Sequence, residues 1–421
     1  MSSERECFVY IVPPGATEFV TAGRFRWTED GAGEVGRFVY GRSYRERSDA
    51  VELDPVELRL SSQVYETARM EGYFGAIRDS MPDFWGRRVI ECNAGFTELA
   101  EFDYLLQGPD DRAGALGFGL NVNPPSPRRR FNRTLDLGRL QKAADAVVAD
   151  DPQLAGSAGH QAEELMLLGT SMGGARPKAV VEDARAIWLA KFGRNDDRWN
   201  HPRVEHGMLS LARACGLNAA DSRMEAVGGR DVLLVRRFDR DRADAGYRRH
   251  RMVSALTLLR TGDSPGERSD WSYLLFADEV RRVSTTPAED LRELFGRICF
   301  NAAVSNLDDH PRNHAVVAKG RDWRLSPAFD LTPSPVVALE RRDLAMACGR
   351  FGRYANKNNL LSEPGRFLLE EAEATEIFER IARTVHEQWR TRMRRAGVNE
   401  RDCEAIRRAF VYDGLFYENP A

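Results

Sequence analysis

The sequence predicts an α+β protein with more than one domain. Its 421 residues exceed the roughly 100 to 200 residues of a typical domain. Over the first 120 residues, short β-like runs such as "FVYIV" and "RFVYG" alternate with helical runs. Beyond residue 240 the pattern is mostly helical. We therefore expect a mixed N-terminal part and a mainly helical C-terminal part.

Composition excludes several classes of protein. The formal net charge of -3 is not that of a basic nucleic-acid-wrapping chain. The six cysteines include no CxxC pair, so neither a zinc site nor a disulfide framework is indicated. No stretch approaches the roughly 20 apolar residues of a membrane helix, and the opening "MSSERECFVYIVPPG" does not resemble a signal peptide. We expect a cytoplasmic protein.

The chain is expected to divide into three parts. The proline cluster and arginines of "NVNPPSPRRRFNR" indicate a linker after the first part. The runs "KAVVE" and "AIWLAKF" predict a hairpin, "VLLVRRF" predicts a further strand, and apolar positions from Val204 predict a helix that stops at Gly216. Later, "HAVVAKGRDWRLSPAFD" is typical of another hairpin. The predicted boundaries are 1–120, 121–240 and 241–421.

A glycine-rich loop precedes the first hairpin. The run "HQAEELMLL" at 160–168 predicts a helix, which the glycines and proline of "GTSMGGARPK" then end. The loop is not a Walker A motif, because Ala175 and Arg176 replace the lysine and hydroxyl residue. Its backbone amides can still cradle phosphate, with Lys178 nearby. The alternative is an ordinary turn between a helix and a strand.

The stretch "SNLDDHPRNH" at 305–314 concentrates polar side chains. His310 and His314 have the spacing of zinc ligands on a helix, but Pro311 between them disfavours that helix. The interval from Asp308 to Asn313 is instead DxxxxN, the spacing of the catalytic loop in protein kinases. Asp309 lacks this relation, because the residue five positions later is His314. Alone, the motif is weak.

A second carboxylate strengthens the kinase hypothesis. Asp330 follows Asn313 by 17 residues, behind the strand-like run "WRLSPAF", where the aspartate of a kinase DFG motif would stand. Mg²⁺ with ATP phosphates requires hard oxygen ligands, which these side chains provide.

Kinase chemistry also needs a lysine on a strand of the small lobe. In "AIWLAKF", Ile187, Leu189 and Lys191 share one face of the strand, and lysine is rare in this chain, with 56 of its 61 basic residues being arginine. Lys191 is therefore the candidate, and Glu205 on the following helix is a candidate partner. The alternative is a lysine at a strand end whose ammonium reaches water. These assignments predict a protein-kinase-like bilobal fold, with an antiparallel-sheet small lobe and a mainly helical large lobe, after an additional N-terminal α+β domain.

At this point the sequence resembles the HipA-like serine/threonine kinases, the toxins of type II toxin-antitoxin modules. The N-terminal domain of the family is similar to "VTAGRFRW", "FGAIRDSMPDFWGRRVIE" and "DDRAGALGF". The kinase core is similar, in the expected order, to "SMGGARPKAVV", "WLAKF", "VRRFDRD", "NLDDHPRNH", "LSPAFDLTP" and "GRFGRYANKNNLLSE".

The resemblance implies roles for matching residues. Asp308 would be the catalytic aspartate, Asn313 and Asp330 would hold Mg²⁺, and Lys191 would bind phosphate. Ser171 matches the serine that relatives phosphorylate in themselves to switch the kinase off. The ATP-binding residues implied are Gly173, Gly174, Ala175, Lys178, Lys191, Arg236, Phe238, His310 and Asn313.

This chain departs from the family pattern at two places. Arg236 replaces a glutamate that many relatives carry before "RFDR", and "GARPK" replaces GAQxK in the phosphate loop. Pro177 stiffens that loop and removes an amide donor. Both changes put the details of nucleotide affinity in question.

The implied function is an ATP- and Mg²⁺-dependent toxin kinase. Its partners would be a helix-turn-helix antitoxin of the HipB type, operator DNA bound through that antitoxin, and a protein substrate in translation. Two alternatives remain: a small-molecule kinase of the aminoglycoside-phosphotransferase type, and a catalytically silent co-repressor that binds the antitoxin. The arginine-rich stretch 236–251 is expected to form a solvated surface rather than a DNA contact.

Overall fold

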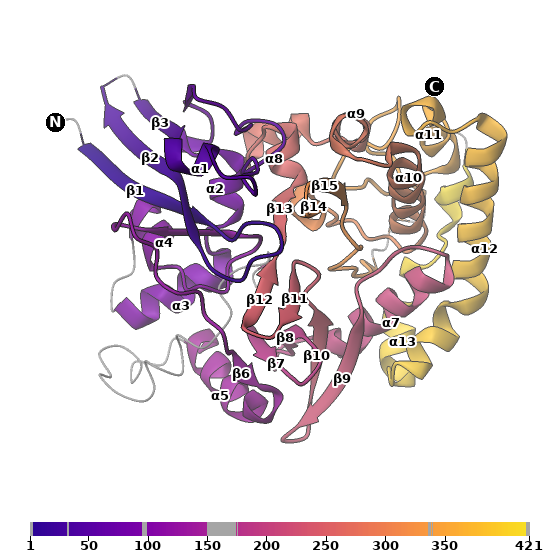
Figure 1. Ribbon diagram of the computed structural model, residues 1–421. Helices are drawn as coiled ribbons and strands as arrows, with labels where there is room; N and C mark the ends of the chain where they lie inside the picture. Colours follow the sequence, from indigo (N-terminus) through magenta and orange to yellow (C-terminus); the bar gives the residue numbers. More distant parts are fainter. Residues whose placement is uncertain are drawn as a thin grey trace. The chain divides into compact units, whose positions relative to one another are not determined.

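A computed structural model describes residues 3–31, 33–94, 99–149, 174, 176–335, 338 and 340–417 (Figure 1). The chain forms two compact units. Unit 1 contains residues 1–194, 226–260 and 317–322, and unit 2 contains residues 195–225, 261–316 and 323–421. The boundaries of the three predicted parts, at 120 and 240, remain a prediction.

The first sheet of unit 1 has the strand order β4-β3-β2-β1-β5. The two β-like runs noted in the sequence lie in β1 and β3, and the longest strand, β2, was not predicted. Alternation sets the buried face, since Phe38 and Tyr40 are buried while Arg37 is exposed and Val39 is only partly buried. The strands are β1 (Ser3–Ile11), β2 (Val20–Asp30), β3 (Gly33–Tyr40), β4 (Val64–Thr67) and β5 (Leu116–Gly119). The helices of this region are α1 (Arg42–Arg45), α2 (Gly75–Asp79), α3 (Phe84–Ala94) and α4 (Glu101–Gln107).

The second sheet of unit 1 has the order β6-β7-β8-β10-β9. Its central strands are antiparallel, and the hairpin expected at 178–192 is confirmed. Asp183 closes the hairpin turn, because its side chain accepts the amide of Ala186 at 2.8 Å. The strands are β6 (Asn132–Arg133), β7 (Lys178–Glu182), β8 (Ile187–Phe192), β9 (Ser222–Val227) and β10 (Arg230–Arg236).

One face of this second sheet carries the core of the region. Ala179, Val181, Trp188 and Ala190 alternate onto that face, where α5 (Leu137–Val148) supplies Leu137, Leu140, Ala144 and Val147. Trp85 and Val89 of α3 belong to the same apolar cluster. The region before residue 120 therefore contributes directly to the core of the second sheet.

Strands also occur where the sequence predicted mainly helix. β11 (Arg240–Ala243) and β12 (Gly246–Arg249) form a hairpin, and β13 (Arg251–Ser254) begins a three-stranded sheet of order β13-β14-β15. The predicted later hairpin is confirmed as β14 (Ala315–Lys319) and β15 (Asp322–Leu325). A short helix, α8 (Ala255–Leu259), follows β13.

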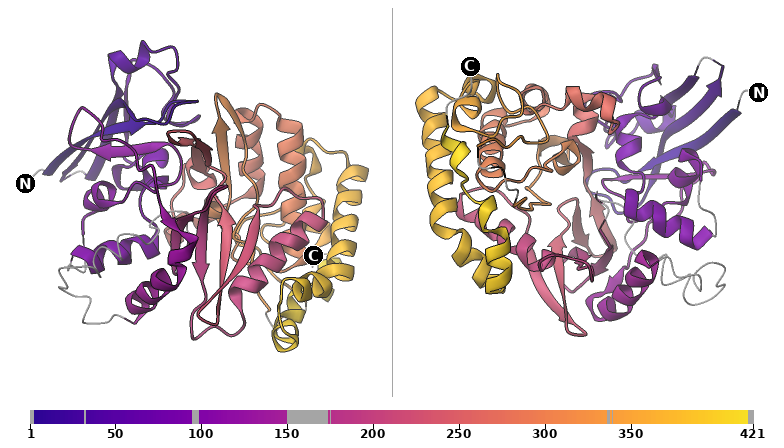
Figure 2. Two further views of the ribbon diagram at one scale, coloured as in Figure 1. Left: turned by 60° about the horizontal axis from the view of Figure 1, so that its bottom comes forward. Right: turned by 180° about the vertical axis from the view of Figure 1, so that it is seen from behind.

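Unit 2 is mainly helical, as predicted for the C-terminal part (Figure 2). Helix α10 packs against α9 and α12, and α12 also packs against α7 and α13. The expected helix near Val204 is α7, which Asn200 caps by accepting the amide of Arg203 at 3.0 Å. Gly216 follows its end with φ +82°, the left-handed conformation that glycine favours. The helices are α7 (His201–Ala214), α9 (Tyr273–Val283), α10 (Pro287–Ala303), α11 (Lys357–Leu360), α12 (Glu371–Arg395) and α13 (Glu400–Ile406).

Seven short 3₁₀ helices are described in addition. They are η1 (Met70–Gly72), η2 (Thr134–Asp136), η3 (Pro265–Asp270), η4 (Pro311–Asn313), η5 (Pro364–Phe367), η6 (Arg407–Ala409) and η7 (Asp413–Phe416). In the part of the chain that the structure describes, no helix combines the length and apolar character needed to cross a bilayer.

Candidate functional site

Asp309 anchors the loop that follows α10. Its side chain is 1% exposed, and Oδ2 accepts from Nδ2 of Asn301 and Nε2 of His314, each at 2.6 Å, and from the hydroxyl of Tyr273. Burial and the charge of Asp309 raise the pKa of Tyr273, which keeps the phenol protonated as a donor. The buried carboxylate is therefore a structural group.

Asp308, its neighbour, is exposed. Its carbonyl oxygen accepts the amide of His310 at 2.9 Å and Nδ2 of Asn313 at 3.2 Å. Two hydrogen bonds thus hold the carbonyl of Asp308 while its carboxylate remains accessible. The DxxxxN spacing singled out Asp308 rather than Asp309, and the catalytic role of the accessible Asp308 carboxylate remains a prediction.

Asn313 and Asp330 stand before and after the β14–β15 hairpin. The amide of Ser326 donates to the carbonyl of Ala315 at 2.9 Å, so the returning strand ends beside the start of the hairpin. Asp330 lies four residues later, partly exposed, with φ +57°. Aspartate tolerates this left-handed conformation better than most residues do, and such backbone outliers cluster at functional sites.

These residues offer oxygen donors for a hard cation. The side-chain nitrogen of Asn313 donates to the carbonyl oxygen of Asp308, so the side-chain oxygen of Asn313 points away from that carbonyl. Asp330 adds a carboxylate. The donor set fits Mg²⁺. Within the described ranges, no group of three or more His, Cys, Asp or Glu side chains is arranged to hold a metal, and the imidazole of His314 is engaged by Asp309. His310 is partly buried, with its ring centroid 6.4 Å from that of Trp271.

Two candidate lysines lie directly opposite each other. Lys178 on β7 pairs with Lys191 on β8 in the antiparallel register. Lys191 is partly exposed, whereas Lys178 is 1% exposed. The ammonium of Lys178 contacts Oδ2 of Asp83 at 2.6 Å and the carbonyl of Gly174 at 2.9 Å. No sequence pattern pointed to Asp83, which lies 95 positions from Lys178.

Other predicted residues of this region are placed only in part. Ser171, Gly173 and Ala175, and the predicted helix at 160–168, lie outside the described residues. Glu205 is buried on α7, in unit 2, while Lys191 belongs to unit 1. The pairing of Glu205 with Lys191 therefore remains a prediction.

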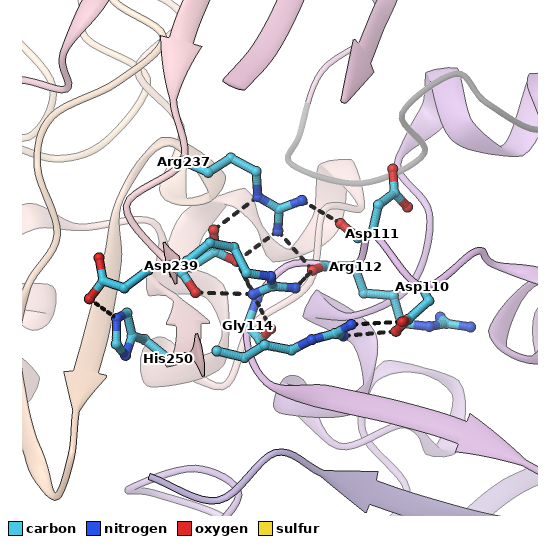
Figure 3. A network of polar contacts seen from close by, with 10 residues as sticks. Asp110, Asp111, Arg112, Gly114, Arg237, Asp239 and His250 are labelled. Atoms are coloured by element: carbon cyan, nitrogen blue, oxygen red, sulfur yellow. Dashed lines mark hydrogen bonds and ion pairs between the residues drawn. The ribbon is translucent and has the colours of Figure 1, made fainter. Parts of the chain in front are cut away.

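A buried polar network holds the strand end that carries Arg236 and Phe238 (Figure 3). Between them, Arg237 donates to both carboxylate oxygens of Asp239 at 3.0 and 2.7 Å. The same guanidinium donates to the carbonyl oxygens of Asp111 at 2.6 Å and Arg112 at 2.9 Å. Arg236 itself is exposed and Phe238 is partly buried.

Asp239 joins this network to the region before residue 120. It accepts Nη1 of Arg240 at 2.7 Å and the amide of Gly114 at 2.9 Å. Burial raises its pKa, but the positive charges of Arg237 and Arg240 outweigh burial and hold the pKa well below the ordinary value.

The expectation of a solvated arginine surface at 236–251 is therefore wrong for several residues, because their guanidinium groups are buried and donate to backbone carbonyls and to buried or partly buried carboxylates. The buried arginines are Arg237, Arg240, Arg249 and Arg251.

Comparison with known proteins identifies the family. The model of the HipA N-terminal domain matches residues 17–119, and that of the HipA-like C-terminal domain matches residues 170–389. A curated relative from Sinorhizobium fredii, "Putative kinase Y4mE", is 25% identical over 344 residues, which cover 77% of this chain and 78% of that protein.

A solved structure shows the same fold. It is the complex of HipA, HipB and operator DNA from the Shewanella oneidensis MR-1 toxin-antitoxin system, with 14% identity and a TM-score of 0.66 over 96% of this chain and 94% of the other. The predicted fold class, α+β with a protein-kinase-like fold and an additional N-terminal α+β domain, is confirmed. Because the C-terminal model matches more than half of the sequence and the N-terminal model precedes it in order, the chain belongs to the HipA-like family.

Proposed function

We propose that this protein is an ATP- and Mg²⁺-dependent protein serine/threonine kinase that acts as the toxin of a type II toxin-antitoxin module. The observation that carries the proposal is the loop at 308–313. An accessible Asp308 stands on a backbone that the buried Asp309 anchors, and Asn313 and Asp330 follow with the spacing of kinase metal ligands.

The chemistry assigned to these residues is proton acceptance and positioning. Asp308 accepts the proton of the substrate hydroxyl as the phosphoryl group is transferred. Asn313 and Asp330 hold Mg²⁺, which neutralises charge on the phosphates when it is bound. Lys191 contacts the phosphates, and the strand end from Val235 to Phe238 contacts adenine. Gly173, Gly174, Ala175 and His310 complete the proposed ATP-binding residues.

The proposed regulation is self-phosphorylation of Ser171. A phosphate would add roughly two negative charges beside the phosphate loop. The added charge disfavours ATP by repulsion, so the modified enzyme would be inactive.

The proposed antitoxin and its operator DNA are suggested by the relative of known structure. That HipA was solved with HipB and operator DNA. For this chain we propose a helix-turn-helix antitoxin of the HipB type, contact with operator DNA through that antitoxin, and a protein substrate in translation. The proposed compartment is the cytoplasm.

The test is incubation of the purified protein with γ-labelled ATP and Mg²⁺. Wild type should label itself, and Asp308→Asn should not. Asp270→Asn is the matched control, since Asp270 is also an exposed aspartate of unit 2. Ser171→Ala should lose self-labelling while it retains ATP binding. Label on Asp308→Asn equal to that of wild type would refute the assignment of the catalytic aspartate.

Two further outcomes separate the alternative functions. Transfer of label to an aminoglycoside-type small molecule, with none to protein, would favour the small-molecule kinase. Absence of a shift in melting temperature with Mg²⁺-ATP would favour the silent co-repressor. The toxin role predicts that expression of wild type, and not of Asp308→Asn, arrests growth, and that co-expression of the antitoxin relieves the arrest.

A further inference from the structure

Two lysines lie opposite each other on adjacent strands, where the phosphate loop (residues 173–178) runs into β7. Lys178 is the first residue of β7, and its partner in the register is Lys191 of β8. Like charges directly opposite in a sheet destabilise it. The side chain of Lys178 is also only 2% exposed, and a buried ammonium requires a counter-charge. Something other than water must therefore compensate Lys178.

Asp83 supplies that charge from the region matched by the N-terminal family model. Its Oδ2 lies 2.6 Å from the ammonium of Lys178, and the carboxylate is 7% exposed. Its other oxygen, Oδ1, accepts the amide of Gly86 at 2.8 Å, in the first turn of the 11-residue helix α3. Each carboxylate oxygen thus has its own partner, and the helix N-terminus further favours the ionised form.

Neighbouring groups fix the backbone around the same ion pair. The indole of Trp85 donates to the carbonyl of Lys178 at 3.1 Å. The amide of Phe192 donates to the carbonyl of Pro177 at 3.0 Å. Both the side chain and the main chain of Lys178 therefore connect the start of β7 to the start of α3.

The ammonium of Lys178 also reaches the loop itself. It donates to the carbonyl of Gly174 at 2.9 Å, across Pro177. Gly174 has φ +94°, and a Cβ built there would lie 3.6 Å from the ammonium. Glycine is favoured at position 174 because of this backbone conformation and not because space is short. The ammonium of Lys178 binds the carbonyl oxygen of the same residue.

We propose that Asp83 is a positioning residue for the end of the phosphate loop, and that Lys178 is an anchor of that loop and not a phosphate ligand. Lys191 is then the lysine that contacts ATP. The inference rests on the proposed function. Its physical basis is that an ammonium shared between a buried carboxylate and a backbone carbonyl has its charge already neutralised.

Kinetics with respect to ATP distinguish this role from direct phosphate binding. Asp83→Asn retains an oxygen that can cap α3 and removes the charge. If Lys178 is an anchor, Asp83→Asn and Lys178→Gln both raise KM for ATP at least tenfold with a smaller change in kcat. The KM of the double variant is then no higher than that of the more impaired single variant, because both substitutions disrupt the same ion pair. If Lys178 binds phosphate, Asp83→Asn frees its ammonium, and KM stays the same or falls, which would overturn the proposal.

Hydrogen exchange of the peptide covering residues 174–182 gives a readout that does not depend on ATP. We expect faster exchange in Asp83→Asn than in wild type, and no change in the control Asp145→Asn. Asp145 forms an ion pair with Arg230, at 2.5 Å, within the same unit. Exchange unchanged in a folded Asp83→Asn would overturn the proposal.

The same measurements separate failure of the proposal from failure of the proposed function. Wild type that binds no Mg²⁺-ATP would refute the kinase, while hydrogen exchange still decides whether Asp83 anchors the loop. If Asp83→Asn does not fold, the double variant Asp83→Asn/Lys178→Gln, with a neutral hydrogen-bonding pair, takes its place. In that variant a restored wild-type KM would show that a neutral hydrogen bond suffices to position the loop end, whereas exchange and KM equal to wild type in the single variant Lys178→Gln would overturn the positioning role.

Discussion

Removing the charge of Asp239 is expected to destabilise unit 1 severely. The carboxylate has no exposed surface and accepts hydrogen bonds from Arg237, Arg240 and the amide of Gly114 (Figure 3). The side chains of the two arginines are 0% and 1% exposed. The variant Asp239→Asn keeps the size of the side chain and leaves both buried guanidinium groups without their shared counter-ion.

The expected loss follows from the cost of an uncompensated buried charge. Breaking a buried ion pair by removing one partner costs about 3 to 5 kcal/mol. Two guanidinium groups depend on this carboxylate, so the upper half of that range is expected. Because folded proteins are stable by only about 5 to 15 kcal/mol, the loss is a large share of the total. With about 2 to 4 °C per kcal/mol for a domain of this size, the melting temperature should fall by roughly 8 to 20 °C.

Urea unfolding followed by circular dichroism, together with thermal melting, measures this loss. The control is Asp244→Asn, because Asp244 is exposed between the strands of the β11–β12 hairpin. It should change stability by no more than about 0.5 kcal/mol. A loss below about 1 kcal/mol in Asp239→Asn would show that the two guanidinium groups do not need this carboxylate, and the electrostatic account of the network would fail.

Three further predictions concern acid stability, the catalytic loop and a close backbone contact. The folded-state pKa of Asp239 is lowered, so its contribution to stability is present above the unfolded pKa of about 3.9 and is lost as pH falls toward the folded value. At pH values below about 4, the urea concentration at the unfolding midpoint of wild type should therefore decrease. The Asp239→Asn variant should lack that part of the decrease. Asp309→Asn should lower both stability, by about 1 to 3 kcal/mol, and phosphoryl transfer, whereas Asp308→Asn should abolish transfer with the melting temperature unchanged; the reverse pattern would exchange their roles. Gly349→Ala should cost about 1 to 3 kcal/mol in urea unfolding, because a Cβ there would lie 2.0 Å from the Asn359 carbonyl oxygen, and a neutral result would mean that the backbone moves apart at little cost.

The parts of the fold that the sequence predicted are those with a single dominant pattern. The hairpin of β7 and β8 and the helix α7 follow apolar periodicities of two and of about 3.6 residues. The strands β11 to β13 were missed because charged residues occupy several of their buried positions. Arg240, Arg249 and Arg251 are buried there, whereas arginine normally marks a solvated face.

Local spacing named the candidates for the site, and their roles stay predictions. The interval from Asp308 to Asn313 singled out Asp308 over Asp309, but the difference in exposure between the two aspartates came only from the structure. Asp83 and the carbonyl oxygens of Asp111 and Arg112 were not predictable, because they reach their partners across 95 and more than 120 positions in the chain. Every residue has a main-chain carbonyl, so the residue types of a sequence cannot show which carbonyl oxygens accept such hydrogen bonds.

The core of the second sheet has a consequence for how members of this family can be divided or recombined. Trp85 and Val89 belong to the segment that the N-terminal family model matches, yet they pack with Leu140 and Ala190 beneath a sheet that lies mostly in the C-terminal match. The two segments match separate family models, but their side chains share one hydrophobic core. A chimera that exchanges residues 1–120 with those of a relative would therefore have to import a helix that fits this core, and truncation at the same point would uncover an apolar surface and favour aggregation.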